Sequence, residues 1–180
     1  MLFCENGLIV YLSTQKKSFM KIILSLVATI IFATSSFAQK SPHDTVTTKQ
    51  LTMTYGRPYK KDRVIFGGLV PYGKVWRLGA DSATQIIFNQ DAKFGGQGIA
   101  KGRYTVFAIP EENEWTIILN SQLGQWGAFG YEKIKDKDVL KVKVPVKKLS
   151  NVVEQLTIKA DKPGLIIAWD QTQVSVPISF

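Results

Sequence analysis

Hydrophobic and polar residues alternate along much of the chain after residue 44. In Val139–Val146, leucine and valine on one face alternate with lysine on the other. A period of two residues is typical of a strand with one buried and one solvent-exposed face. The same period, with many β-branched residues, occurs in Thr45–Tyr55 and Arg103–Ile109. These three segments are therefore predicted to be strands.

Shorter apolar runs, bounded by turn-forming residues, predict further strands. They are Gln85–Asn89, Trp115–Leu119, Val152–Ala160, Leu165–Asp170 and Val174–Phe180. The chain would then hold about eight or nine short strands. The only helix candidate is Val146–Gln155, which we expect to be short because Pro145 precedes it and β-branched residues fill it. Strands without interleaved helices predict an all-β fold, and we expect a single-domain antiparallel β-sandwich, jelly-roll-like, with long loops rich in glycine and aromatic residues.

Two segments keep no regular period. The first, Tyr55–Thr84, contains three of the four arginines together with many glycine and aromatic residues. The second, Asn120–Tyr131, has the same glycine and aromatic character. Long irregular segments inside a domain are usually functional or disordered, and these are too rich in large apolar side chains to be disordered. We expect ordered, packed loops that the sandwich supports.

The first forty residues have the pattern of a secretory leader. Lysines precede the uncharged apolar run Ile22–Phe32, and Ser36–Ala38 supplies small residues at the expected cleavage positions. We therefore interpret residues 1–19 as a mis-called upstream extension, residues 20–38 as a signal peptide cleaved after Ala38, and residues 39–180 as one β-sandwich domain. The expected location is periplasmic or secreted. An uncleaved membrane anchor is the alternative.

The composition limits the classes of binding partner that we expect. The net charge is +9, but the cations are mostly dispersed lysines, which is typical of a solvated surface. Attraction to anionic polymers or to the envelope surface is the functional alternative. Nucleic acid is not expected as a partner, because no dense basic cluster is present. The only cysteine, Cys4, precedes the predicted cleavage site, so the exported domain would have neither a disulfide nor a lipid anchor.

The sequence lacks the residues that most catalytic mechanisms require. The exported part would have a single histidine, His43, in a segment (39–45) expected to be a loose N-terminus, so no metal site and no cofactor are expected. A serine nucleophile would lack a partner base. Carboxylates near the loops are Asp62, Asp81, Asp91 and Glu114. Their spacing singles out no pair of the kind that glycosidases use, so hydrolysis by carboxylate or lysine chemistry remains open.

A ligand-binding set of residues remains. Arginine presents a planar fork of donors to anions, and aromatic faces suit sugar rings. The candidate ligand-binding residues are Arg57, Tyr72, Trp76, Arg77 and Asp81 from the first loop and Asn120, Gln125 and Trp126 from the second. We expect Arg77 to serve the site and Arg57, between Gly56 and Pro58, to serve the structure. The alternatives are that Trp76 belongs to the core, that Arg77 pairs with Asp81, and that Asn120 caps a turn.

The sequence also resembles a known family. The run YGRPYKKDRVIFGGLVPYGKVWRLGADSAT, followed by GRYTVFAIP, EWTIILN and QWGA, is similar to the domain of unknown function 2911 family over nearly all of residues 43–179. The resemblance implies an exported, envelope-associated protein and no particular activity. The family pattern reads RTGAN where this chain has RLGAD, so Leu78 and Asp81 depart from it.

Three functions are compatible with the sequence. The first is an exported binding module for a glycan or another polar or anionic small molecule. The second is a hydrolase, and the third is a purely structural envelope protein. We favour the binding module and expect no catalysis, because the loops offer arginine and aromatic residues but no recognisable catalytic set.

Overall fold

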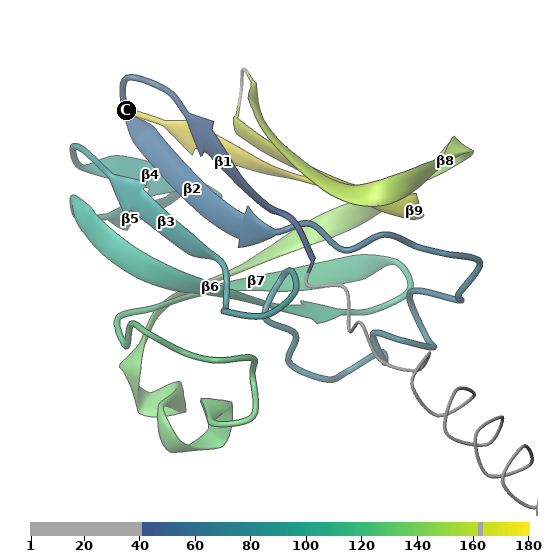
Figure 1. Cartoon of the computed structure of the whole chain (residues 1–180). Helices are drawn as coiled ribbons and strands as arrows, with labels where there is room; N and C mark the ends of the chain where they lie inside the picture. The colour runs from purple at the N-terminus through teal and green to yellow at the C-terminus, as the bar shows by residue number, and fades with distance from the viewer. Residues whose placement is uncertain (1–40, 162–163) are drawn as a thin grey trace, which may run out of the picture. The chain divides into compact units, whose positions relative to one another are not determined.

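The computed structural model describes residues 41–161 and 164–180, and its only regular elements there are strands and two short 3₁₀ turns (Figure 1). Every strand pairing is antiparallel, which confirms the predicted all-β fold. Within these residues, no helix has the length and apolar character that crossing a membrane requires. The predicted leader and upstream extension lie outside the described residues.

Nine strands form one continuous sheet. They are β1 (His43–Thr47), β2 (Leu51–Gly56), β3 (Gln85–Phe88), β4 (Ala92–Phe94), β5 (Gln97–Ile99), β6 (Gly102–Pro110), β7 (Glu114–Asn120), β8 (Asp138–Asp161) and β9 (Gly164–Ser179). The order is β1-β2-β3-β6-β7-β8-β9-β4-β5. The 3₁₀ turns η1 (Tyr131–Lys133) and η2 (Lys135–Lys137) precede β8.

Strand β8 joins the two layers of the sandwich. Its first part pairs with β7, and from Val146 onward it pairs with β9, so the sheet folds over on itself (Figure 1). Its register with β9 shifts between Lys148 and Val153 and again before Thr157. Such irregularities bend a strand and increase its twist. The chain crosses from one layer to the other between β3 and β4 and returns between β5 and β6, which is the jelly-roll-like element of the topology.

Three local predictions are wrong. The single strand predicted over residues 45–55 is two strands, because the Thr48 hydroxyl accepts hydrogen bonds from the amides of Gln50 and Leu51 and turns the chain. Residues 43–45, predicted to be loose, lie in β1 and pair with β2. The helix candidate, residues 146–155, lies within β8, where pairing with β9 overrides any local helical preference.

The core lies between the layers and has an aromatic centre. The Trp76 and Trp169 rings stack with centroids 6.0 Å apart and planes at 19°, and Trp115 meets Trp76 edge-on at 5.9 Å. All three are buried. Trp76 therefore belongs to the core, as the alternative to a ligand-binding role had it, and it is the tryptophan that the first loop contributes.

The first loop, defined from here as residues 57–84, is ordered and packed, as predicted. Ile65 and Leu78 are fully buried, and Trp76 exchanges two backbone hydrogen bonds with Ala108 of β6. The start of the loop bonds to β8 through the Lys60 amide and the Glu154 carbonyl. The loop therefore has a fixed position on the sandwich, and any site built on it is preformed.

Candidate functional site

Arg77 occupies a rigid position on the first loop. Its neighbour Trp76 accepts a hydrogen bond from the Ala108 amide at 2.8 Å and donates one to the Ala108 carbonyl at 2.7 Å. The Arg77 carbonyl accepts a hydrogen bond from the Thr84 amide at 3.1 Å, and the Thr84 hydroxyl donates to the Leu78 carbonyl at 2.7 Å. The backbone is thus fixed on both sides of the arginine.

The Arg77 guanidinium lacks a partner within the described residues. Its side chain makes no hydrogen bond or ion pair with any residue in 41–161 or 164–180, and its Nε is buried. A buried N–H without a partner costs about 1–3 kcal/mol, and this cost concerns Nε alone, because Arg77 as a whole is half-buried. The two Nη atoms are not among the buried unpartnered atoms, so they are the donors that a ligand could reach.

Arg77 lines a pocket between the two loops. The second loop is defined here as residues 121–130, between β7 and η1. The pocket has a volume of about 220 Å³ and is lined by Leu69, Val70, Pro71, Lys74, Val75, Trp76, Arg77, Ala128 and Phe129. The lining contains two cations and no acid, and its remaining members are apolar. This arrangement favours a small ligand with one anionic group and one apolar face.

Tyr72 lies beside this region but does not line the pocket. Its ring packs on Gly67, where an added Cβ would stand 3.0 Å from the ring and where φ is +83°. Burial raises the pKa of the Tyr72 hydroxyl, and the carboxylates of Glu112 and Glu111 raise it further. Those acids therefore act on Tyr72 near the pocket without entering its lining.

Two of the predicted ligand-binding residues are fully engaged in structural bonds. Arg57 donates from Nε to the Leu156 carbonyl at 3.1 Å and from Nη2 to the Thr157 hydroxyl at 3.2 Å, and it forms an ion pair with Asp44. Asn120 is 0% exposed. Its amide nitrogen donates to the Ile134 carbonyl and the Asp138 carboxylate, while its oxygen accepts from the Gln122 amide. Neither residue lines the pocket.

Asp81 pairs with His43 rather than with Arg77. The His43 Nε2 and Asp81 Oδ2 atoms lie 3.2 Å apart. Asp81 has φ +60°, a left-handed conformation in which aspartate and asparagine are enriched. Aspartate is thus compatible with the backbone that this position requires. Leu78, the other departure from the family pattern, also has a positive φ, of +52°.

The second loop presents its aromatic residues to solvent. Trp126 is 65% exposed and Phe129 is 88% exposed. Gln125 binds locally, with its amide donating to the Leu123 carbonyl. Lys74 and Phe129 were missed as site residues from sequence. Lys74 reads as one more dispersed lysine, and only the packing of one loop against the other brings Phe129 to Arg77.

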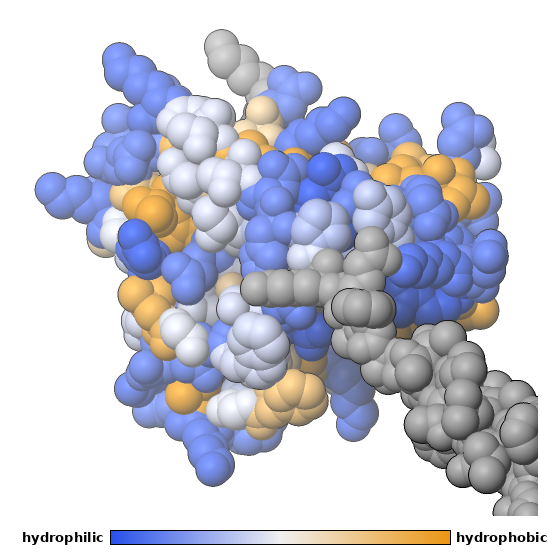
Figure 2. Space-filling model, viewed as in Figure 1, coloured by the Kyte–Doolittle hydropathy of each residue, from blue (hydrophilic) through white to orange (hydrophobic). Residues whose placement is uncertain are grey.

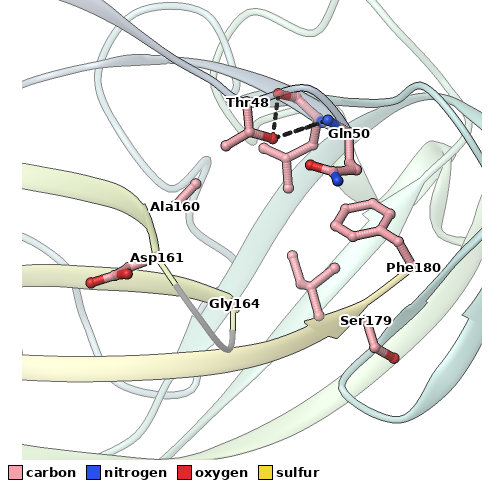
Figure 3. A pocket seen from close by; sticks show the side chains of 9 residues that line it. Thr48, Gln50, Ala160, Asp161, Gly164, Ser179 and Phe180 are labelled. Atoms are coloured by element: carbon pink, nitrogen blue, oxygen red, sulfur yellow. Dashed lines mark hydrogen bonds between the residues drawn. The ribbon is translucent and has the colours of Figure 1, made fainter.

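A larger pocket lies elsewhere, at the end of the sandwich formed by the β1–β2 turn and the β8–β9 hairpin (Figure 3). It has a volume of about 590 Å³ and is lined by Thr48, Gln50, Leu51, Ala160, Asp161, Gly164, Ile178, Ser179 and Phe180. No predicted site residue lines it. The Thr48 hydroxyl is engaged in the turn. Volume alone does not make this pocket the better candidate, because no lysine or arginine lines it, whereas two cations line the smaller pocket.

The fold and site define an antiparallel β-sandwich with a small cationic pocket held between two long loops. The chain belongs to the family described as protein of unknown function DUF2911, whose model matches residues 38–178. No curated protein and no solved structure matches the chain. In the part of the chain that the structure describes, no three His, Cys, Asp or Glu side chains gather as a metal site would require.

Proposed function

We propose that this protein is an exported binding protein for a small carboxylate-bearing molecule, held in the pocket between the two loops. The observation that carries the proposal is the position of Arg77, which lines the pocket and whose side chain bonds to none of residues 41–161 and 164–180. A carboxylate supplies two acceptors in the plane that the guanidinium fork matches. Lys74 adds a second positive charge, and the apolar wall contacts the rest of the ligand.

Size limits the ligand. Pockets for drug-sized ligands are usually about 300–1,000 Å³. The volume here, about 220 Å³, suits one sugar ring or a short organic acid. Charge limits it further, because two cations without an acid in the lining disfavour a cationic ligand. A uronic acid, a sugar with a carboxylate, satisfies both limits.

Binding is favoured over hydrolysis by the engagement of the carboxylates. Asp91 accepts a hydrogen bond from the Lys101 amide at 2.8 Å, Glu114 pairs with Lys143, and Asp81 pairs with His43. None of these acids lines the pocket. A general acid or base must lie within hydrogen-bond reach of the bound ligand, and the pocket presents no carboxylate in that position.

The test uses galacturonate and galactose, two sugars that differ in one carboxylate. Binding is followed by ¹H–¹⁵N NMR, including the Nε–H resonance of Arg77. We expect galacturonate to shift this resonance and galactose to bind at least about tenfold more weakly, since a charge-assisted hydrogen bond contributes about 1.5–3 kcal/mol.

Arg77→Gln should remove most of the galacturonate affinity. Arg103→Gln is the matched control, because Arg103 is exposed on β6 and the same charge is lost away from the pocket. Equal binding of the two sugars, or equal loss in the two variants, contradicts the proposal.

Export is a separate part of the proposal. It rests on the leader pattern of residues 20–38. Mass spectrometry of the protein recovered from outside the cytoplasm should show an N-terminus at Gln39. A mature chain that retains residues 20–38 would contradict cleavage after Ala38.

A further inference from the structure

Trp126 and Phe129 are the two most exposed aromatic side chains in the described part of the chain, at 65% and 88%. Both belong to the second loop and contribute little to the core. Exposed aromatic side chains in one place commonly mark an interaction site. Because Phe129 also lines the Arg77 pocket, the two rings bear directly on what the pocket binds.

The loop holds Trp126 in place. Trp126 pairs with Ser82 in an antiparallel bridge between the two loops. The Ala83 amide donates to the Gln125 carbonyl at 2.9 Å, and the Gly127 amide donates to the Asp81 carbonyl at 3.1 Å. Directly paired residues place their side chains on the same side, so the Ser82 hydroxyl stands beside the indole. Both side chains are exposed.

Phe129 connects Trp126 to the pocket. Its ring lies against Gly127, where an added Cβ would stand only 2.8 Å from it and where φ is +74°. The second loop therefore carries both Trp126 and Phe129, and Phe129 lines the Arg77 pocket. The bonds between the two loops hold the backbone that carries them, which lowers the entropy cost of binding a ligand that contacts both the indole and the pocket.

The surroundings of Trp126 favour a sugar over a lipid bilayer. Sugar rings place apolar C–H faces on an indole and direct hydroxyls toward neighbouring polar groups. Ser82 and Gln125 are such groups, and Asp81 lies in the facing segment. In the space-filling view, apolar colour appears as separate small patches among hydrophilic side chains on the face shown (Figure 2). A bilayer would instead favour one continuous apolar face.

We infer that the pocket and the Trp126 face together form a binding site for an acidic polysaccharide. One uronic acid unit places its carboxylate at Arg77, and the neighbouring unit stacks on Trp126. This inference rests on the proposed function, because it assigns a polymer to the same pocket. Single-stranded nucleic acid also combines stacking with negative charge, but it needs cations along a groove, and the pocket offers only Lys74 and Arg77.

The experiment compares galacturonate with tetragalacturonate by calorimetric titration, using the wild type, Trp126→Ala and Phe180→Ala. Phe180 is the matched control, because it is an exposed aromatic residue at the larger pocket. A tetramer offers four units to one site, and this statistical effect alone raises affinity by up to about fourfold. If the neighbouring unit also stacks on Trp126, we expect the wild type to bind the tetramer at least about tenfold more tightly than the monomer. Trp126→Ala should reduce this ratio to about fourfold or less without changing monomer affinity, and Phe180→Ala should change neither.

The outcomes separate the inference from the proposed function. Monomer binding with a tetramer advantage that Trp126→Ala leaves intact overturns the inference and leaves the proposed function standing. Failure of the wild type to bind either sugar overturns both. An oligothymidylate that binds more tightly than tetragalacturonate, with the same dependence on Trp126, assigns the surface to nucleic acid and overturns the inference.

Discussion

Arg57 and Arg77 lie on the same loop, yet their replacement by alanine should have opposite consequences for stability. Arg57 links three parts of the fold. It extends from the end of β2, donates to the Leu156 carbonyl and the Thr157 hydroxyl of β8, and pairs with Asp44 of β1. Arg57→Ala removes all of these bonds at once. Arg77→Ala removes no bond to residues 41–161 or 164–180.

The magnitude follows from the number and kind of bonds that Arg57 makes. A hydrogen bond from a charged donor contributes about 1.5–3 kcal/mol, and both acceptors here are only partly buried, so we use the lower end. The ion pair is partly exposed on both sides and adds less than about 1 kcal/mol. The free energy of unfolding should therefore fall by about 2–4 kcal/mol in Arg57→Ala. In Arg77→Ala it should change by less than about 1 kcal/mol, or rise, because sites are often maintained against stability.

Urea unfolding and thermal melts measure the difference. For a domain of this size each kcal/mol corresponds to about 3 °C, so Arg57→Ala should melt about 6–12 °C below the wild type with an unchanged urea m-value. Arg103→Ala is the control for loss of an arginine on the exposed surface. Similar large losses in Arg57→Ala and Arg77→Ala would refute the reasoning, because Arg77 would then have structural partners. A wild-type melting temperature in Arg57→Ala would show that its bonds contribute nothing.

Two further predictions concern pH and close packing. The Tyr131 hydroxyl lies 2.5 Å from Asp138, and burial, with that carboxylate, raises its pKa well above the usual 10. The stability that the protonated Tyr131 hydroxyl contributes is fully present below about pH 10 and is lost at higher pH. In urea titrations, the wild type should therefore lose stability above about pH 10 more steeply than Tyr131→Phe. Parallel curves for the two proteins would contradict this. At Gly56 an added Cβ would stand 2.3 Å from the Ala80 carbonyl oxygen, so Gly56→Ala should lower stability by at least about 1–3 kcal/mol. Gly98→Ala, where an added Cβ meets nothing within 4 Å, should cost far less, and equal losses would refute the packing argument.

The fold was predictable where the alternation of apolar and polar residues follows the alternation of buried and exposed positions. The alternation in residues 139–146 directly reports which side of β8 faces the core, because Leu140, Val142 and Val144 are buried. The pattern fails where it continues through a turn. Residues 45–55 keep their period across Thr48, whose hydroxyl bonds make the turn. A side-chain hydrogen bond of this kind does not change the hydrophobic pattern, so the pattern cannot reveal the turn.

The site was predictable in part for a similar reason. Arg77 stands out in the sequence because it adjoins Trp76 and Gly79. Its lack of a partner could not be predicted, because it depends on which acidic residues the fold brings near the Arg77 side chain. The sequence gives no sign that Asp81 pairs with His43 instead, because those residues are far apart in the chain and meet only through β1. Asn120 is of a residue type that often binds ligands, yet it is buried and its hydrogen bonds stabilise the second loop.

The turn that follows Arg77 is fixed by hydrogen bonds. Leu78 and Asp81 both have positive φ, at +52° and +60°, and such residues cost about 1–3 kcal/mol each unless the surroundings over-determine them. Both are over-determined here. The Thr84 hydroxyl donates to the Leu78 carbonyl, and the Gly127 amide donates to the Asp81 carbonyl. The first bond lies within the first loop, and the second ties the second loop to the turn after Arg77. Positive φ is not confined to this turn, because Lys61 and Asp62 of the same loop have it too. What distinguishes the turn is its bond to the second loop, which fixes the backbone of that loop relative to the turn that follows Arg77, and both loops line the pocket of the proposed ligand.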